Sequence, residues 1–317
     1  MEITKVTYLV FALVIAVALA LDLGLLSKKN TVITIKKALF QTLFWVTLAI
    51  GFFVFLWFEQ DRKHALEYLS AYVMEWSLSI DNIFVFIIIF SAFKVREKFY
   101  GRVLLIGILM AIVFRIIFIT IGVALVDQFS WILYLFAIFL LYTGYKMFTS
   151  TEEEEFDPQE SKVYKFLRRF LPIANHDGNG KFIVKANGRP VYTSLFVVVI
   201  LLATIDVVFA LDSIPAVMGI SRDKLIIYTS NTFAVLGLRS LFFLLRGAVS
   251  KFDYLQQGIA IVLVFIGVKM LTEKWINLYI DKESQVLLSL LVILACIAGS
   301  IVYSVYHQKK GTPKDIQ

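Results

Sequence analysis

The stretch Glu75-Trp-Ser-Leu-Ser-Ile-Asp81-Asn82 lies inside an apolar run that is long enough to cross a membrane. A second stretch, Asp206-Val-Val-Phe-Ala-Leu-Asp212-Ser213-Ile-Pro215, follows about 130 residues later and again places two carboxylates six positions apart. An ionisable side chain at the bilayer centre costs roughly 2.5–3.5 kcal/mol, so such residues usually mark a path for ions or protons. The two motifs therefore predict a membrane protein with a functional group of buried carboxylates.

The composition agrees with a chain that is mostly embedded in lipid. Of the 317 residues, 59% are hydrophobic and 17% are charged, and the mean hydropathy is +0.81. Apolar runs of about 20 residues predict nine spans, at 6–26, 38–58, 66–92, 103–126, 130–148, 192–214, 225–246, 254–272 and 285–306. We therefore expect an all-α, polytopic membrane protein with about nine transmembrane helices.

Cysteine and histidine are nearly absent, and this limits the chemistry. The single cysteine, Cys296, excludes a disulfide framework within the chain. The three histidines, His64, His176 and His307, fall in predicted loops or in the tail. A zinc or copper site within the membrane would need imidazole or thiolate ligands, so only oxygen ligands remain. No nucleophile–base pair or cofactor fingerprint is present, and we expect neither an enzyme nor a bound cofactor.

The net charge of +7 is distributed as a topology signal rather than as a nucleic-acid surface. With nine spans, 20 of the 31 lysines and arginines fall on one side, in 27–37, 94–102, 149–191, 246–253 and the C-terminal tail. The other side holds 7, and 4 lie within spans. Positively charged loops favour the cytoplasm, which predicts an external N-terminus and a cytoplasmic C-terminus. The expected partner of this charge is the lipid bilayer, and no nucleic acid is expected.

Two segments of the chain resemble one another and predict an inverted repeat. Four matches pair Glu75/Asp81 with Asp206/Asp212, Arg96-Glu97-Lys98 with Arg222-Asp223-Lys224, Arg115 with Arg239, and Gly144-Tyr-Lys146-Met147 with Gly267-Val-Lys269-Met270. Each unit has three spans, so the second unit inserts upside down, a plan that is common among secondary transporters. The expected units are two flanking helices in 1–65, repeats in 66–148 and 192–272, a polar loop in 149–191, and a ninth span with its tail in 273–317.

The segment 149–191 is the one long polar stretch between the predicted spans. Its Asn187-Gly188 pair lies between two short apolar runs and predicts a small hairpin. The preceding Asn175-x-Asp177-x-Asn179-Gly180 superficially resembles a calcium loop but lacks the bidentate glutamate, so a solvated turn is expected.

Helical geometry places the two carboxylates of each motif on different faces of their helix. At 100° per residue, Glu75 and Asn82 share one helix face, as do Asp206 and Ser213, whereas the second carboxylate of each motif stands about 120° away. Both carboxylates of one motif can reach a single point only if the helix unwinds or the site lies off its axis. Pro215 supplies such a break in the second motif, because it cannot donate to the Leu211 carbonyl.

Charge counting favours a hard divalent cation. The predicted metal-site residues are Glu75, Asp81, Asn82, Asp206, Asp212 and Ser213, and the supporting residues are Arg115, Arg239, Asn231, Asp22 and Pro215. Four carboxylates and two arginines leave −2, which suits one divalent ion or two protons. Oxygen ligands select ions such as Mn²⁺, Mg²⁺ or Ca²⁺, and metal entry should be coupled to proton release.

A structural role for the same residues stays open. Arg115 and Arg239 could pair with two of the aspartates and hold helices together without binding an ion. Asp22, in Leu21-Asp22-Leu23-Gly24, is near a span end and fits a boundary residue as well as a ligand.

Four long motifs resemble the TerC family of integral membrane proteins. They are Leu21–Gly24, Glu75–Phe86, Val208–Ala216 and Tyr228–Arg239, and the resemblance covers essentially the whole chain. The family is named for tellurite resistance, is associated with manganese export, and has a fold grouped with lysine-exporter-like transporters. The resemblance implies a bacterial inner-membrane exporter of Mn²⁺ as the transported substrate. Many members of the family carry an acidic residue where this chain has Ala203, which implies one fewer carboxylate here.

Two other readings remain. The protein could be a membrane scaffold that recruits cytoplasmic stress-resistance proteins through 149–191, or it could bind the tellurite oxyanion through Arg115 and Arg239. The excess of carboxylates disfavours the second. The oligomeric state is left open, with a homo-oligomer among the alternatives.

Overall fold

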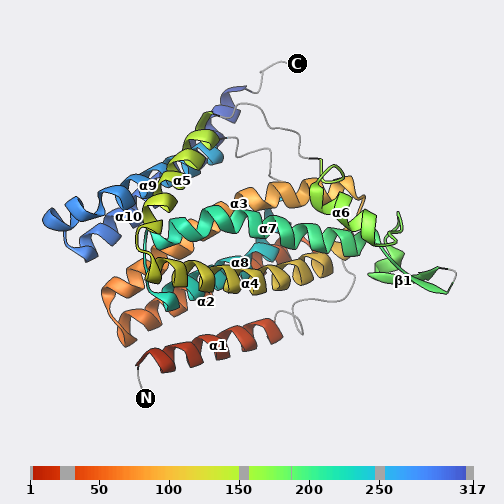
Figure 1. The fold of residues 1–317 in the computed structure, drawn as a ribbon, viewed down its shortest axis with the longest axis horizontal. Coiled ribbons are helices and arrows are strands. Elements are labelled where there is room, and N and C mark those ends of the chain that lie inside the picture. The colour runs from red at the N-terminus through yellow and green to blue at the C-terminus, as the bar shows by residue number, and fades with distance from the viewer. Residues whose placement is uncertain (1–2, 22–32, 150–156, 187, 247–253, 312–317) are drawn as a thin grey trace.

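The computed structural model describes residues 3–21, 33–149, 157–186, 188–246 and 254–311, and it is almost entirely helical (Figure 1). The nine long helices of this part of the chain are α1 (Ile3–Leu21), α2 (Ile35–Glu59), α3 (Arg62–Ala92), α4 (Glu97–Gln128), α5 (Ile132–Thr149), α7 (Ser194–Met218), α8 (Lys224–Leu245), α9 (Leu255–Tyr279) and α10 (Lys282–Gly311). A short helix, α6 (Lys162–Phe170), a single 3₁₀ turn, η2 (Gly178–Gly180), and a two-stranded sheet complete the described elements.

Each of the nine predicted spans overlaps one of these long helices, and residues 22–26 of the first span lie outside the described residues. Seven of them, α2, α4, α5 and α7 to α10, are long and apolar enough to cross a membrane within the described residues. The apolar part of α1 is shorter, and α3 carries Glu67, Glu75 and Asp81 among its apolar residues. The all-α membrane fold is therefore confirmed, whereas the count of nine spans stays a prediction.

The outer surface of the helices is apolar, as lipid contact requires. Large hydrophobic side chains stand exposed along α1, α2, α4, α5 and α10, including Phe40, Phe58, Tyr142 and Val302. A water-soluble monomer rarely exposes contiguous apolar surface of this kind. Polar and charged side chains turn inward instead, and Glu75, Arg115 and Asp206 are all buried. This distribution reverses the pattern of a soluble domain.

The helices form two packed groups. In one group α3 packs on α8, α4 packs on α7, and α2 covers α3 and α8. In the other, α9 packs between α5 and α10, and these three lie together along one side of the bundle in Figure 1. Contacts of α10 with α3 and of α5 with α7 join the groups. The motif helices α3 and α7 also contact each other, so both motifs face the same interior.

Two glycines allow α5 and α9 to approach closely. A Cβ added to Gly144 would lie 2.9 Å from the Ala260 carbonyl oxygen and 2.8 Å from a Val264 methyl group. A Cβ added to Gly267 would lie 2.9 Å from the Ala137 carbonyl oxygen. Real Cβ atoms essentially never come so close, so any larger residue at either position would force the two helices apart.

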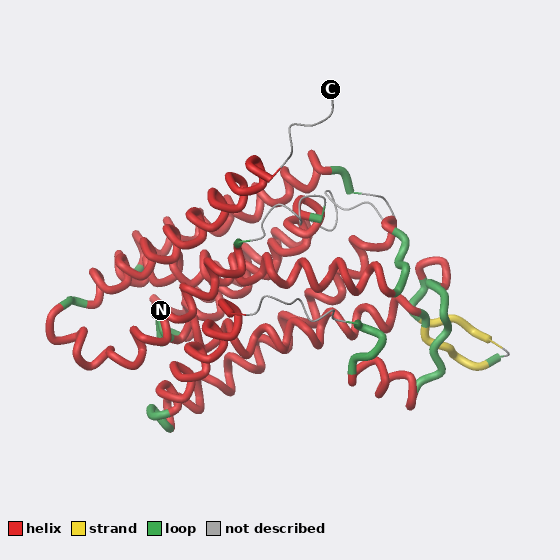
Figure 2. The backbone as a smooth tube through the Cα atoms, turned by 90° about the horizontal axis from the view of Figure 1, so that it is seen from above, coloured by secondary structure: helices red, strands yellow, loops and turns green. Residues whose placement is uncertain are grey.

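The polar segment after α5 forms a small cap at one end of the bundle. The predicted hairpin is confirmed, with β1 (Ile183–Ala186) pairing antiparallel to β2 (Arg189–Tyr192), and it projects beyond the helices in Figure 2. Asn187 lies outside the described residues, and Gly188 has a φ of +77°, as an Asn-Gly turn requires. The sequence did not predict α6, although Ser161 caps its start and Leu167 is buried at its centre.

The turn at Asp177 also binds a distant arginine, which the sequence did not predict. Arg96 lies at the start of α4 and donates to both Asp177 carboxylate oxygens and, at 2.9 Å, to Asn179 Oδ1. This side-chain hydrogen bond from Arg96 lowers the pKa of the Asp177 carboxyl group below its ordinary value. The acidic turn therefore binds an internal cation and fastens the cap to the bundle.

Candidate functional site

Four helices bring a central charge cluster together, which we define as Glu75, Arg115, Asp206 and Asn231. The Arg115 guanidinium on α4 donates from Nε and Nη2 to the two oxygens of Asp206 on α7, at 2.6 and 3.0 Å. Its Nη1 donates to Glu75 Oε2 on α3 at 2.8 Å and to Asn231 Oδ1 on α8 at 3.3 Å. One arginine thus joins the first carboxylates of the two sequence motifs.

The cluster is fully enclosed by protein. Glu75 is 0%, Asp206 1%, Arg115 2% and Asn231 3% exposed. A bidentate contact between arginine and a carboxylate is among the stronger hydrogen-bonded pairs, and burial increases its electrostatic strength. Two carboxylates and one guanidinium still leave the cluster with a net charge of −1. A buried group with one excess negative charge suits a further cation as its counter-ion.

Several oxygens in this region lack a hydrogen-bond partner among the described residues. They include Glu75 Oε1 and the hydroxyl oxygens of Ser79 and Ser213, and the Asn231 amide nitrogen is likewise unpartnered. On α3, Glu75, Ser79 and Asn82 are all buried and fall on one face at helical spacing. Buried polar atoms are nearly always hydrogen-bonded, so unpartnered oxygens on both motif helices indicate room for a ligand's contacts.

The second carboxylate of the second motif lies in a different direction. Asp212 is only partly buried, and its Oδ1 accepts a hydrogen bond of 3.4 Å from Thr143 on α5. The helical spacing predicted this divergence from Asp206. The sequence did not identify Thr143, although a polar residue directly before the matched Gly144 motif could have drawn attention to it.

The expected break of α7 at Pro215 is not seen. The helix continues through Pro215 to Met218, because the proline stands in its last turn, where only one backbone hydrogen bond is lost. The Gly219 amide donates to the Pro215 carbonyl at 3.0 Å and helps to close the helix end. Because α3 is also continuous, the motif carboxylates meet across helices rather than within one helix.

Two of the predicted site residues cannot be placed. Asp22 and the side chain of Asp81 lie outside the part of the chain that the structure describes. Arg239 is buried on α8, as the pairing of Arg239 with Arg115 in the sequence suggested.

The described side chains do not form a ready-made metal cage. No group of three His, Cys, Asp or Glu residues close enough to hold an ion occurs among them. Glu75 and Asp206 are instead bound by Arg115, so a cation can reach both carboxylates only if the guanidinium yields one of them. A narrow apolar crevice lined by Phe86, Gly107 and Leu202 reaches Asp206 and has no room for water. The carboxylates suit a hard cation, but this arrangement is closed.

Comparison with known proteins identifies the family. The model of the integral membrane protein TerC family matches residues 60–312. A membrane protein of Rickettsia felis is 41% identical over 95% of this chain and 98% of its own length. A membrane protein of Myxococcus xanthus is 41% identical over 96% of this chain and 93% of its own length.

A third relative, from Escherichia coli K12, bears the provisional name membrane-bound redox modulator Alx. It is 39% identical over 95% of this chain and 96% of its own length. No solved structure matches the chain. The family match and the full-length relatives agree with the buried charges and apolar exterior described above, and the chain is a multi-pass integral membrane protein that belongs to the TerC family.

Proposed function

We propose that this protein exports a divalent metal cation, Mn²⁺, from the bacterial cytoplasm in exchange for protons. The observation that carries the proposal is the unpartnered Glu75 Oε1, a buried carboxylate oxygen beside Arg115 at the junction of the two motifs. Leaving such an oxygen unsatisfied costs free energy, which a bound metal ion or proton would recover. Its position in the membrane interior fits an ion path.

The ligands on offer match the proposed ion. Carboxylate, amide and hydroxyl oxygens bind Mn²⁺ and Mg²⁺ readily and discriminate against metals that require sulfur or nitrogen. A metal ion entering the cluster would take Glu75 or Asp206 from Arg115. Protonation of the same carboxylate would release the metal, because a protonated acid is a poor ligand. Metal and proton would therefore compete for one site, as exchange requires.

The packing of the helices supports an inverted repeat with the site between its halves. The first helix of each proposed unit packs on the second helix of the other, as α3 with α8 and α4 with α7. The third helices, α5 and α9, pack on each other. A pseudo-two-fold axis would produce this pattern, and transporters of that plan bind their substrates where the repeats meet. The nine spans, the inner-membrane location and the cytoplasmic C-terminus form part of the same proposal.

Manganese efflux from a manganese-sensitive bacterial strain tests the proposal. We expect the wild-type protein to lower cell-associated manganese, and Glu75→Gln and Asp206→Asn to abolish the effect at matched expression. Asp81→Asn and Asp212→Asn test the second carboxylate of each motif. Asp127→Asn is the matched control, since this exposed carboxylate pairs with Lys224 at the end of the bundle. Unchanged efflux in both Glu75→Gln and Asp206→Asn would remove the cluster from the transport path.

A scaffold function remains the second candidate, and α6 is the observation that favours it. Phe166 and Phe170 of this helix are 62% and 63% exposed, and their rings lie 4.7 Å apart. An exposed aromatic pair on a helix outside the bundle can bind a partner protein. Replacing both with serine should abolish metal resistance but leave efflux intact if the protein acts as a scaffold. If the protein is an exporter, we expect metal resistance and efflux to persist in this double variant.

The name of the Escherichia coli relative raises a redox role. This chain has a single cysteine, Cys296 on α10, so it cannot form the internal disulfide of a dithiol redox protein. A redox effect is therefore proposed here only as a consequence of changed metal levels.

A further inference from the structure

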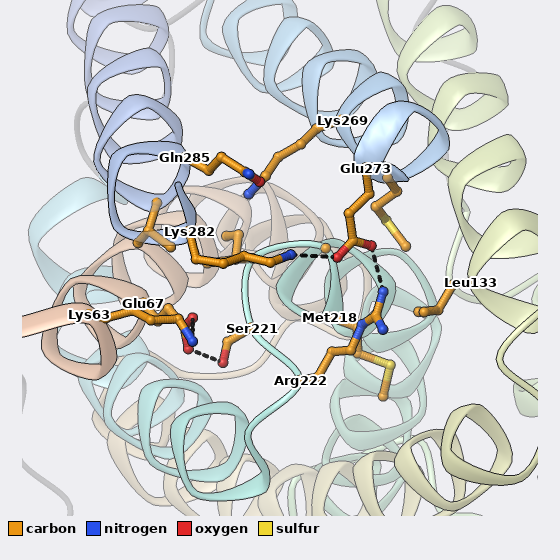
Figure 3. A pocket seen from close by; sticks show the side chains of 14 residues that line it. Lys63, Glu67, Leu133, Met218, Ser221, Arg222, Lys269, Glu273, Lys282 and Gln285 are labelled. Carbon is orange, nitrogen blue, oxygen red and sulfur yellow. Dashed lines mark hydrogen bonds and ion pairs between the residues drawn. The ribbon is translucent and has the colours of Figure 1, made fainter. Parts of the chain in front are cut away.

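A second polar site lies at the end of the bundle opposite α6 and the hairpin. A cavity of about 240 Å³ opens between the start of α3, the turn from α7 to α8, the end of α9 and the start of α10. Its charged lining consists of four cationic side chains, Lys63, Arg222, Lys269 and Lys282, and two carboxylates, Glu67 and Glu273 (Figure 3). The lining therefore carries a net charge of +2, whereas the central charge cluster is negative.

Both carboxylates of the cavity are already occupied. Glu273 accepts from Arg222 at 2.5 Å through Oε2 and from Lys282 at 2.9 Å through Oε1 (Figure 3). Glu67 accepts from the Ser221 hydroxyl at 2.5 Å through Oε2 and lies 3.5 Å from Lys63 through Oε1. A cation entering the cavity would have to displace one of these partners. The carboxylates thus position the basic groups and leave few free acceptors.

The cavity retains many hydrogen-bond donors. Lys269 on α9 donates to Ser289 Oγ at 3.0 Å and makes no ion pair among the described residues. An ammonium group carries three donors and a guanidinium five, so Lys269, Lys282 and Arg222 together have more donors than the two carboxylates accept. A donor-rich, positively charged cavity recognises an anion with several acceptor oxygens.

We propose that this cavity binds a small, multiply charged oxyanion of the phosphate class. Its volume is below the roughly 300–1,000 Å³ of pockets that hold drug-sized ligands, which suits an ion or a single headgroup. A phosphate dianion would neutralise the +2 lining and join α9, α10 and the turn from α7 to α8. This site is separate from the central charge cluster in position and in the sign of its charge, so it stands whether or not the protein exports manganese.

Phosphate binding to the purified full-length protein in detergent tests the proposal. Inorganic phosphate is titrated at constant ionic strength, with chloride as the balancing anion, and binding is followed by radiolabelled equilibrium dialysis and by the unfolding midpoint. We expect saturable binding that stabilises the wild-type protein. Lys269→Gln and Lys282→Gln should each weaken it at least tenfold. Lys282 is 51% exposed, so its variant should fold even if removal of the more buried Lys269 does not.

A matched variant separates specific binding from general charge. Lys224 lies at the same end of the bundle but outside the cavity, where it pairs with Asp127. Lys224→Gln removes the same charge and should leave phosphate affinity unchanged. Equal weakening in Lys224→Gln and Lys282→Gln, or binding that never saturates, would overturn the proposal.

A second arm identifies the source of the phosphoryl group. Short-chain phosphatidic acid, whose phosphomonoester headgroup can carry two negative charges, is added as a competitor of radiolabelled inorganic phosphate, with a zwitterionic short-chain lipid as its control. Binding of inorganic phosphate alone assigns the cavity to a free anion. Competition by phosphatidic acid at a lower concentration than unlabelled phosphate requires, with none by the zwitterionic lipid, assigns it to a lipid headgroup. Binding of neither probe by the wild-type protein rejects the proposal.

Discussion

Gly144 on α5 and Gly267 on α9 occupy equivalent places in one close contact between helices. Gly144 faces the carbonyl of Ala260, seven residues before Gly267, and Gly267 faces the carbonyl of Ala137, seven residues before Gly144. The two glycines also align in the sequence, each two residues before a lysine-methionine pair. This reciprocity is the relation that a two-fold axis between the proposed repeats would impose. It makes the contact between α5 and α9 sensitive to any added atom.

The glycine contact predicts a loss of stability on adding one methyl group. Gly144→Ala or Gly267→Ala places a Cβ within 2.9 Å of a backbone oxygen, which cannot move aside as a side chain can. We expect a loss of about 1–3 kcal/mol, measured as a lower unfolding midpoint in detergent. Gly51→Ala is the control, because this helical glycine has nothing within 4 Å of the added atom. Equal midpoints for all three variants would show that the helices separate freely.

Removing Arg115 should destabilise the protein more than any single change at its surface. Arg115→Gln leaves Glu75 and Asp206 buried without their shared counter-ion, and breaking a buried ion pair in this way typically costs about 3–5 kcal/mol. The double variant Arg115→Gln/Asp206→Asn should recover part of this loss, because it removes one of the stranded charges. Chemical unfolding and size-exclusion chromatography measure both effects. Full stability in Arg115→Gln would show that Arg115 is not needed as the counter-ion of the two carboxylates.

Replacing Ser213 should reduce transport without reducing the stability of the fold. Its hydroxyl oxygen is buried without a partner among the described residues, so Ser213→Ala should leave stability unchanged or raise it by up to about 1 kcal/mol. If this hydroxyl binds the transported ion, manganese efflux should fall severalfold in the same variant. Ser70→Ala is the control, since the Ser70 hydroxyl donates to the Leu66 carbonyl at 2.8 Å. Normal efflux in Ser213→Ala would exclude Ser213 from the ion path.

The clasp between Arg96 and Asp177 should open in acid. Because Arg96 lowers the pKa of the Asp177 carboxyl group, the clasp contributes fully above the ordinary value of 3.8 and is lost as the pH falls through the lowered pKa. The hydrogen-exchange protection factors of the β1 and β2 amides, which correct the exchange rate for its intrinsic pH dependence, should therefore fall at the acid end of the titration. Arg96→Gln should give low protection factors at every pH. Arg189→Gln removes a charge on the exposed part of the hairpin and should behave as wild type. Wild-type protection factors that do not change with pH would contradict this assignment.

The sequence predicted the helices well because each span carries its own signal. Apolar length locates α2, α4 and α7 without knowledge of their neighbours, and the Asn-Gly turn likewise locates the hairpin from local residues alone. Arg115 could also be identified from the sequence as a counter-charge to the motif carboxylates. It could not show that Glu75 and Asp206 share this arginine, since that depends on how α3, α4 and α7 pack.

The cavity at the end of the bundle opposite the hairpin could not be predicted from the sequence, because it too depends on how the helices pack. Glu67, Lys269 and Lys282 are far apart in the chain, and each taken alone resembles a charge at the end of a span. No local motif joins them. They meet only because the start of α3, the end of α9 and the start of α10 lie side by side. The short helix α6 was missed although its cap and buried Leu167 were visible, because nine residues give a weak periodic signal.

Arg115 gives the central charge cluster a cation that cannot leave. Its guanidinium is covalently part of α4, yet it occupies the carboxylates that a transported ion would use. In the proposed exporter, this tethered guanidinium would balance one of the two carboxylate charges even after the transported ion has left. The proposed exporter would then change conformation on the return half of its cycle without leaving both carboxylates unpaired in a low-dielectric interior. The arginine would lower the barrier to resetting the carrier, and so set how quickly one ion can follow another.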